Sequence, residues 1–507
     1  MENLALIYIG GNTTRFALWE IHKDRSYRLI ESFKENLKLG GDILDDYTVS
    51  EEKIDALLKI IRFINGFSVS MGAEHPHIIL SEFFDRIKNK DDISRRLQNE
   101  LFLDIIDLSD EEELNLDYLA LKNSMRIEDA LIVDISGGST SLAYIRDGEL
   151  KERFLLPFGT LNLTEKFNLH QVVSKDAHEN LEAFLKVELD KVPWLNKNPG
   201  GEMIILGGSA RAISKIDRKK RRYPMNIIHE YEMQKTDIKT MYLTFLTKTL
   251  KQRYSIEGLD KDRADILPGA LSILNAIIEK TEIDNLRVSG VGIREGFLFY
   301  YLIKKFGELP NMLDRSIQNI LKIHSVDQQR ASKLYTLTRD IYISLNGVHK
   351  IWPDWEEILK TSAMLRDVGL SVRYYNHDAH NFYIISNAEI NGMDHRQIIM
   401  AALAATFTNG IPKDAPLLKY GQIINRLDLK QVFDMGICLS IAEKLLRSSV
   451  KEVKLIHVDI TSDEVKLCFE SNESLQYEIY SVLRLHEVFY ELYGKNLSVC
   501  DETENHS

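Results

Sequence analysis

The amino-acid sequence predicts an α/β protein with two duplicated lobes, followed by a helical domain and a small α+β module. Three observations support this prediction. Apolar, strand-like runs at 4–9 and 130–135 each end in a turn of small residues, and a second strand-like run follows each turn. Helical periodicity dominates from about residue 310 onward. Apolar and polar residues then alternate within 452–482, as in strands with one buried face.

The first lobe is expected to begin with a β-hairpin. Residues 5–9 form a buried, apolar run, and residues 16–21 form the expected partner strand. Helical spacing over 50–66 predicts a helix with Ser50 as its N-cap. A further short strand is expected over 77–80, so strand and helix patterns alternate through the first lobe.

The second lobe repeats this beginning. Residues 140–145 are expected to return beside the strand at 130–135, and Asp147-Gly148 indicates a hairpin turn after them. A third apolar run at 203–206 leads through a glycine turn into a helical pattern. Because strand, glycine turn and return strand open each half, we interpret the two lobes as a duplication.

Helical segments are predicted after the two lobes, within 317–321, 331–345, 355–365, 396–407 and 432–446. The polar tail at 501–507 is expected to be disordered. The predicted domains are therefore 1–125 for the first lobe, 126–305 for the second lobe, 306–445 for the helical domain and 446–507 for the small C-terminal module.

Composition narrows the classes of function. A chain of 507 residues is too long for one hydrophobic core, and its net charge of −12 argues against a wholly basic face for nucleic acids. Cys438, Cys468 and Cys500 are widely spaced, so we expect neither a metal pattern nor a disulfide framework among them. This cysteine usage and the absence of a recognisable signal peptide or apolar membrane span predict a cytoplasmic protein without a membrane partner.

Three glycine turns are the candidate phosphate-binding elements. Backbone N–H groups in such a turn can converge on one anion, and glycine leaves room for a phosphate to approach. Serine and threonine hydroxyls add hydrogen-bond donors. Two such turns far apart in the chain suggest two lobes that grip a phosphate chain between them. The candidate residues are Gly10, Gly11, Asn12, Thr13 and the neighbouring Arg15 in the first turn, Gly137, Gly138, Ser139 and Thr140 in the second, and Gly207, Gly208 and Ser209 in the third.

An ordered set of motifs resembles the exopolyphosphatase and guanosine pentaphosphate phosphohydrolase (Ppx/GppA) family. Residues 8–15 resemble the family's Asp-x-Gly-Ser-Asn-Ser-x-Arg, and residues 134–140 resemble the start of its Asp-x-Gly-Gly-Gly-Ser-Thr-Glu. Further similarities occur at 157–165, 207–211, 223–231, 263–270 and 294–296, in the family's order. One such motif would be weak evidence, but the ordered set is strong evidence, and the resemblance as a whole covers nearly the whole chain.

The resemblance implies two actin-like (ribonuclease H-like) lobes of the superfamily that contains sugar kinases, heat-shock chaperone ATPases and actin. It also implies Mg²⁺ as cofactor and a homodimer. The helical domain is similar to HD-type phosphohydrolases, with His324, Asp367 and His380 among the similar residues. Arg366 stands where an HD metal site needs histidine, so we interpret this domain as a scaffold.

The implied reaction is the release of terminal phosphate from inorganic polyphosphate, or of the γ-phosphate from guanosine pentaphosphate, by in-line attack of water. The resemblance places the catalytic carboxylate at Glu112, with Glu113 one register away as the alternative. It places Asp134 where the family binds Mg²⁺. The structural alternatives are an acidic helix N-terminus for Glu112 and an aspartate that caps its own turn for Asp134.

Several substitutions favour a second hypothesis. Tyr8 replaces the aspartate of the first motif, and Ser141 replaces the glutamate after the second phosphate turn. Asp85 aligns with a phosphate-binding arginine, although Arg86 is one register away. Since each lost donor typically costs about 10²–10³ in rate, the chain is alternatively a catalytically weakened homologue that binds polyphosphate or a guanosine alarmone and regulates a partner. An ATP-dependent kinase of the same superfamily is a third hypothesis.

The densest positive cluster has two interpretations. One is the wall of a channel for a polyanion, in which each neutralised phosphate adds salt dependence. The other is a solvated loop, which is the usual role of a bare charge run. The cluster consists of Arg218, Lys219, Lys220, Arg221 and Arg222.

Overall fold

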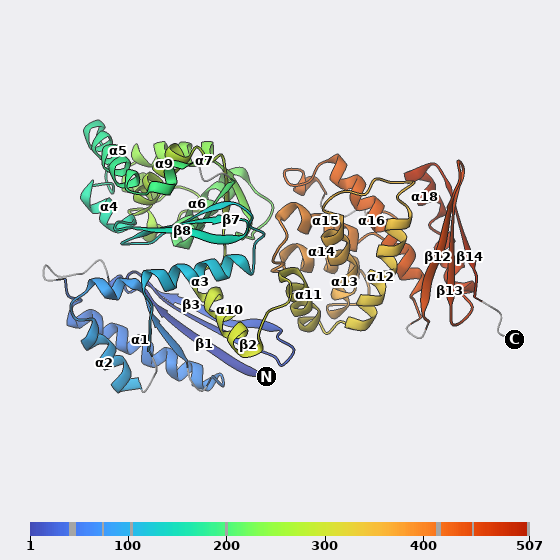
Figure 1. Ribbon diagram of the computed structural model, residues 1–507, viewed down its shortest axis with the longest axis horizontal. Coiled ribbons are helices and arrows are strands. Elements are labelled where there is room, and N and C mark those ends of the chain that lie inside the picture. The colour runs from blue at the N-terminus through green and yellow to red at the C-terminus, as the bar shows by residue number, and fades with distance from the viewer. Residues whose placement is uncertain are drawn as a thin grey trace. The chain divides into compact units, whose positions relative to one another are not determined.

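The computed structural model describes residues 1–39, 47–73, 76–101, 105–197, 201–411, 417–448 and 451–503. The chain divides into two compact units, one of residues 1–223 and 227–310 and the other of residues 224–226 and 311–507 (Figure 1). None of the helices in the described residues combines the length and the apolar character that a membrane crossing requires.

The first unit contains two sheets. The first sheet has the strand order β3-β2-β1-β4-β5. Its strands are β1 (Glu2–Ile9), β2 (Thr14–Ile21), β3 (Tyr27–Glu35), β4 (His77–Leu80) and β5 (Ile105–Asp107). The expected hairpin is confirmed, because β1 pairs antiparallel with β2, and β4 joins β1 in parallel.

Residues of β1 alternate between the two faces of the first sheet, as the period of a strand requires. Ala5 and Ile7 face a core completed by α1 (Glu51–Ser70) and α2 (Lys90–Leu101). Leu4 and Leu6 face the opposite core, to which α3 (Asp110–Lys122) and α10 (Ile293–Phe306) contribute. Helices therefore cover both faces of this sheet, and Tyr8 belongs by its register to the face that α3 covers.

The second sheet has the order β10-β11-β9-β6-β7-β8. The hairpin between β6 and β7 has the antiparallel pairing of β1 and β2, which matches the expected duplication. Asp147 and Gly148 have φ values of +52° and +70°, the left-handed conformation of a tight hairpin turn. The strands are β6 (Ala130–Ile135), β7 (Thr140–Arg146), β8 (Glu149–Leu156), β9 (Glu202–Leu206), β10 (Tyr231–Gln234) and β11 (Asn285–Val288).

Helices of the second lobe build its larger core on one face of this sheet. They are α4 (Thr160–Lys166), α5 (Lys175–Asp190), α6 (Gly207–Arg221), α7 (Lys235–Leu246), α8 (Leu250–Arg253) and α9 (Leu267–Thr281). The opposite face of the sheet, which includes Ala130 and Ile132, packs on Leu114 and Leu121 of α3. Helix α3 thus contributes to the cores of both sheets.

Helix α10 returns to the first lobe. Phe297 and Leu302 lie in the core that contains Leu4 and Leu6. A Cβ at Gly296 would collide with the carbonyl oxygen of Leu116, so the backbones of α10 and α3 touch. The end of the sequence segment assigned to the second lobe therefore completes the core of the first.

The second unit begins with a bundle of helices and ends with a small sheet. Its helices are α11 (Met312–Ile323), α12 (Gln328–Ser344), α13 (Trp355–Met364), α14 (His377–Asn387), α15 (His395–Ala405), α16 (Arg426–Leu445), α17 (Gln476–Leu483) and α18 (His486–Tyr493). Strands β12 (Val453–Ile460), β13 (Glu464–Ser471) and β14 (Asn496–Asp501) form a sheet in which β14 is parallel to β13. The described 3-10 helices of the chain include Glu82–Arg86, Pro193–Lys197, Lys261–Arg263, Val368–Ser371 and Leu417–Tyr420.

Two expectations about the C-terminal region are wrong. Cys468 and Cys500 form a disulfide, because β14 lies beside β13 in the register that pairs these two residues. Their separation of 32 residues hides this proximity in the sequence. Asp501 belongs to β14 and its carboxylate accepts hydrogen bonds from Thr503, so the expected disordered tail does not begin at 501. Residues 504–507 lie outside the described residues.

Candidate functional site

A cavity of about 820 Å³ opens in the first unit, where the hairpin turns of both sheets face helices α3 and α10. Backbone and side-chain atoms from widely separated parts of the sequence meet there. Most of the residues singled out from the sequence line this cavity, namely Gly10, Gly11, Asn12, Thr13, Arg15, Asp134, Gly137, Gly138, Gly207, Gly208 and Ser209.

The turns of the two hairpins are equivalent. Gly10 N–H donates to the carbonyl oxygen of Thr13 at 3.0 Å, and Ser136 N–H donates to that of Ser139 at 3.0 Å. Each bond closes a tight turn between two antiparallel strands. A Cβ at Gly11 would lie 2.6 Å from the ring of Phe83, so the first turn fits its surroundings only with glycine there.

The third turn begins helix α6 beside Asp134. Gly207 has a φ of +87°, and a Cβ there would collide with Oδ1 of Asp134. This oxygen is buried and has no hydrogen-bond partner among the described residues. The N-terminus of α6 adds the positive end of a helix dipole to the cavity, which favours anions.

Strand register decides which side chains reach α3. Tyr8 in β1 and Asp134 in β6 lie on the α3-facing sides of their sheets, in phase with Leu6 and Ile132. Glu113 and Asp117 are one helical turn apart on α3 and both line the cavity. Because both sheets pack on this helix, the four polar side chains converge at the point where the lobes meet.

Glu113 is the carboxylate that the structure places in the cavity. Its Oε1 accepts a hydrogen bond from the backbone N–H of Glu82 at 3.0 Å and one from the Tyr8 hydroxyl at 3.2 Å. Burial, with repulsion from Glu82 as a second cause, raises the pKa of Glu113 to about 8. A carboxylate with such a pKa is suited to accept a proton near neutral pH.

Glu112, the residue to which the sequence assigned catalysis, lies outside the cavity. Its Oε2 accepts hydrogen bonds from the backbone N–H and the hydroxyl of Ser109, at 2.9 and 2.7 Å. Ser109 is the N-cap of α3, so Glu112 is the third helical residue of a capping box. These hydrogen bonds lower the pKa of the exposed Glu112 carboxyl. The geometry therefore corresponds to the structural alternative for Glu112 and favours Glu113 as the carboxylate at the site.

Partly buried guanidinium groups supply positive charge to the cavity. Burial, with repulsion from Arg15 as a second cause, lowers the pKa of Arg211 to about 9. Burial likewise lowers the pKa values of Arg15 and Arg263. None of these three guanidiniums forms an ion pair within the described part of the chain. All three residues are partly exposed and line the cavity, so their hydrogen-bond donors are available to an anionic ligand.

Arg86, rather than Asp85, faces the cavity. Its Nη1 donates to the carbonyl oxygen of Gly138 at 2.7 Å, and its Nη2 lies 3.0 Å from Oε2 of Glu82. Asp85 is exposed and forms an ion pair with Lys90 at 2.5 Å. The expected reversal of charge at the phosphate site is therefore absent from the described cavity lining, because the arginine is present one residue later.

Two groups of expected site residues lie elsewhere. The Ser139 hydroxyl donates to Oε1 of Glu82 at 2.7 Å, and the Thr140 hydroxyl donates to the Phe158 carbonyl at 2.9 Å. Both residues are buried and neither lines the cavity. The basic run 218–222 ends helix α6, about 20 Å along the axis from Gly207. It is not part of the described cavity lining, and the C-terminal end of a helix dipole favours its positive charge.

Several lining residues were missed as site residues by the sequence reasoning. Arg211, Arg263 and Arg294 belong to motifs quoted for the resemblance, so the motifs themselves carried that signal. Asp117 had one available signal, its spacing of four residues from Glu113 on a predicted helix face. Glu82 had no signal in the sequence, because its position in the cavity depends on contacts with Ser139 and Arg86 in the folded chain.

The residues at the HD-like position form an ion-pair network instead of a metal set. Arg366 is buried and contacts Glu443 at 2.9 Å and Asp378 at 3.4 Å. Its guanidinium also donates to the Ala405 carbonyl. Asp367 pairs with Arg330 at 3.1 Å. Among the described residues, His324 and Asp367 belong to no group of three or more metal-ligating side chains.

Comparison with known proteins identifies the family of this chain. The model of the Ppx/GppA phosphatase family matches residues 22–305, and that of Ppx/GppA phosphatase domain III matches residues 313–482. A solved family member from Aquifex aeolicus is similar, with a TM-score of 0.54 and 24% identity over 61% of this chain and 99% of that one. A second structure, the Aquifex aeolicus PPX-GPPA enzyme, has a TM-score of 0.52 and 25% identity over 59% of this chain and 99% of that one.

An exopolyphosphatase structure from Cytophaga hutchinsonii shares the fold, with a TM-score of 0.56 and 18% identity over 60% of this chain and 98% of that one. Similarity at this level of identity concerns the fold, and the family models carry the assignment. Two family models in sequence order span both the lobes that form the cavity and most of the second unit. This protein therefore belongs to the Ppx/GppA phosphatase family.

Proposed function

We propose that this protein is a phosphoanhydride hydrolase of the exopolyphosphatase type, which releases terminal phosphate from inorganic polyphosphate or the γ-phosphate from guanosine pentaphosphate. One observation carries the proposal. The guanidiniums of Arg15, Arg211 and Arg263 form no direct ion pair among the described residues, and they share a cavity with three glycine turns and with Glu113. A phosphate chain would bring several negative charges to this cluster of cations.

In the proposed reaction, the glycine turns and the arginines hold the phosphate chain, and Glu113 orients a water molecule toward the terminal phosphorus. Glu113 then accepts the proton of this water as the new phosphorus–oxygen bond forms and the anhydride bond breaks. The Tyr8 hydroxyl and the backbone N–H of Glu82 fix the carboxylate of Glu113 in place. Positioning and electrostatic stabilisation supply most of the catalysis in such phosphoryl transfers.

Asp134 and Asp117 are the residues that would hold Mg²⁺. The buried Oδ1 of Asp134 has no hydrogen-bond partner among the described residues, as expected for an oxygen that a cation completes. Burial and the nearby Asp134 raise the pKa of Asp117, so a cation would relieve repulsion between the two carboxylates. Mg²⁺ typically takes one or two protein carboxylates together with substrate phosphates, and when bound it neutralises phosphate charge.

A pair of adjacent glutamates gives the direct test of this function. Phosphate release from long-chain polyphosphate with Mg²⁺ is measured for the wild type, Glu113→Gln and Glu112→Gln, with polyphosphate binding recorded in parallel. We expect Glu113→Gln to bind while release falls by about 10²–10⁴-fold, the usual contribution of a general base. Glu112→Gln should retain activity, because glutamine also completes a capping box.

The outcomes separate the hypotheses. Binding without release in the wild type would support the second hypothesis, a weakened homologue that acts as a regulator. Equal losses in both variants would contradict the role of Glu113. If polyphosphate neither binds nor reacts, guanosine pentaphosphate is the next substrate to assay. The homodimer implied by the family is also part of this proposal, and light scattering on the purified protein measures it.

A further inference from the structure

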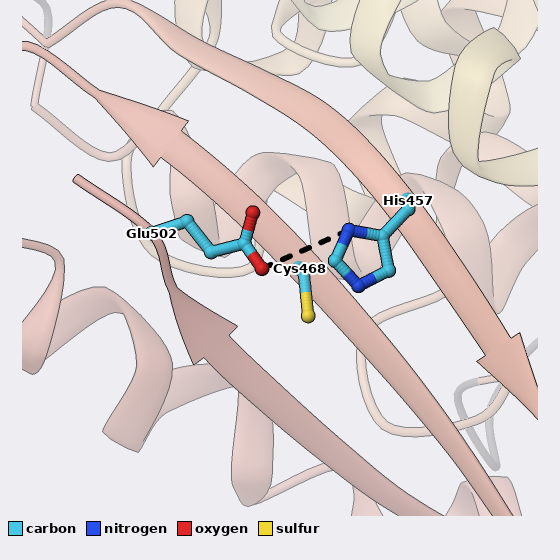
Figure 2. Close-up of side chains that lie close together, drawn as sticks. All are labelled: His457, Cys468 and Glu502. Atoms are coloured by element: carbon cyan, nitrogen blue, oxygen red, sulfur yellow. Dashed lines mark ion pairs between the residues drawn. The ribbon is translucent and has the colours of Figure 1, made fainter. Parts of the chain in front are cut away.

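Three side chains form a row across the C-terminal sheet. His457 of β12 pairs with Cys468 of β13, which pairs with Cys500 of β14. Cys468 shares its face of β13 with Lys466 and Glu470, both exposed, yet Cys468 itself is fully buried. The neighbouring side chains cover it, and Figure 2 shows His457 and Glu502 on either side of Cys468.

The atoms in this row match a metal ligand set. Within the described residues, the ligand atoms of His457, Cys468 and Glu502 lie within 4.8 Å of one another. Nδ1 of His457 is 3.7 Å from Oε1 of Glu502 (Figure 2). The sulfur of Cys500 is bonded to that of Cys468, so a fourth donor is present at the same point. Two thiolates, one imidazole and one carboxylate make the four donors that a tetrahedral Zn²⁺ site uses.

A second observation points to the same ligand set. The other ring nitrogen of His457, Nε2, lies 3.5 Å from Oδ2 of Asp459. Metal-binding histidines commonly direct their second nitrogen to a carboxylate, which fixes the tautomer and orients the ring. His457 therefore has Nδ1 near Glu502 and Nε2 near Asp459.

We propose that the C-terminal sheet binds one Zn²⁺ through His457, Cys468, Cys500 and Glu502 when the Cys468–Cys500 disulfide is reduced. Reduction requires a dithiol or phosphine, which supplies two electrons, while two protons complete the two thiols. Metal binding then forms two zinc–sulfur bonds and releases both thiol protons. Since the same sulfur atoms serve in both forms, the disulfide and the metal exclude each other.

The required movements are small. In a tetrahedral site with zinc–sulfur bonds of about 2.3 Å, two sulfur atoms lie roughly 3.8 Å apart. The sulfur atoms separate to that distance by side-chain rotation, while the histidine and glutamate atoms move inward by about 1 Å from their spacing of up to 4.8 Å. Either link joins β14 to β13, so the module keeps a cross-strand connection in both redox states.

Zinc binding to the full-length protein tests the proposal. The chain is reduced with a phosphine that does not bind zinc, stripped of metal with a chelator and titrated with Zn²⁺ by calorimetry, and bound zinc is counted by elemental analysis. We expect one tightly bound zinc per reduced chain and none per oxidised chain. Asp459→Asn, which leaves all four donors in place, should weaken zinc binding by about 10-fold or more.

Variants distinguish the site from adventitious binding. His457→Ala and Glu502→Gln should each lower the affinity of the reduced protein for zinc by more than Asp459→Asn, and both leave the cysteines intact. Glu464→Gln and His486→Ala are matched controls outside the ligand set and should bind zinc as the wild type does. Three results would overturn the proposal. They are zinc binding by the oxidised protein, zinc binding by His457→Ala that equals that of the controls, and no zinc binding by the reduced wild type. No outcome depends on phosphatase activity, so the test is independent of the proposed function.

Discussion

The Tyr8 hydroxyl donates a hydrogen bond to the carboxylate of Glu113, with 3.2 Å between Oη and Oε1. Tyr8 occupies a strand position at which the family motif has an aspartate, so a carboxylate has been replaced by a hydrogen-bond donor. This donor contacts the carboxylate that we propose orients water. The substitution therefore changes which hydrogen bonds hold the Glu113 carboxylate, and it leaves the glycine turn after β1 in place.

Removing that hydroxyl tests this relationship. The hydrogen bond from Tyr8 lowers the pKa of Glu113, so Tyr8→Phe should raise it and leave less carboxylate at pH 7. Because a hydrogen bond to a charged group contributes about 1.5–3 kcal/mol, we expect phosphate release at pH 7 to fall by at least about 10-fold. Tyr118→Phe is the control, since it removes a hydroxyl on α3 that bonds to the Gly148 carbonyl outside the cavity. Equal activity of the two variants would contradict the role of Tyr8.

Activity and stability should depend on pH in opposite directions. Burial raises the pKa of Glu113 from its usual 4.5 to about 8, so the folded chain retains a proton that the unfolded chain has lost. The free energy of unfolding should therefore decrease as pH rises from about 4.5 to 8 and then level off. In contrast, kcat/KM at low Mg²⁺ should increase over the upper part of that range as the carboxylate forms.

Glu113→Gln provides the control for this pH dependence, because glutamine does not titrate. Urea unfolding at a series of pH values should show a weaker decrease of the free energy of unfolding in this variant than in the wild type. The same slope in both proteins would exclude Glu113 as the titrating group.

Variants of the neighbouring residues Arg86 and Asp85 compare the effect of a charge in the cavity with that of a charge on the surface. Arg86→Gln removes a guanidinium that contacts Gly138 in the second phosphate turn, so we expect kcat/KM for polyphosphate to fall about 10²–10³-fold, the cost of a lost phosphate donor. The salt dependence of binding should also become weaker. Asp85→Asn should change neither quantity by more than about 2-fold, since Asp85 is exposed and pairs with Lys90. A larger effect from Asp85→Asn would restore the alignment that places position 85 at the phosphate.

Two glycines with similar φ values allow the contact with Asp134 to be tested. Gly207 and Gly307 have φ values of +87° and +78°, so alanine at either position is strained by its backbone conformation. A Cβ at Gly207 would also collide with Oδ1 of Asp134, whereas one at Gly307 would meet no atom within 4 Å. Thermal unfolding should therefore show a larger destabilisation for Gly207→Ala.

The same pair of variants reports on the proposed cation site. Thermal stabilisation by Mg²⁺ should be lost in Gly207→Ala, because the displaced Asp134 carboxylate no longer presents its free oxygen. Gly307→Ala should be stabilised by Mg²⁺ as the wild type is. If both variants respond equally to Mg²⁺, the assignment of Asp134 to the cation is contradicted.

The sequence by itself determined the two lobes and their glycine turns. These features are local, because an apolar run followed by small residues specifies strand and turn within about ten positions. The motif at 207–211 likewise predicted a strand that leads into a helix N-terminus, as β9 and α6 have. Arg15 was identified as the neighbour of the first turn, whereas the assignment of Asp134 came from the family resemblance.

Only the tertiary structure decided which carboxylate and which cation face the cavity. Consecutive residues on a helix point about 100° apart, so only one of Glu112 and Glu113 can face the cavity. The acidic run at 110–113 does not show which one, because this depends on how α3 packs between the two sheets. The sequence was ambiguous by one residue in the same way at Asp85 and Arg86, and the structure shows that Arg86 faces the cavity. The Cys468–Cys500 pair required the parallel pairing of β14 with β13 across 32 residues. In each case the decisive contact joins segments whose proximity depends on packing, and local sequence patterns do not encode it.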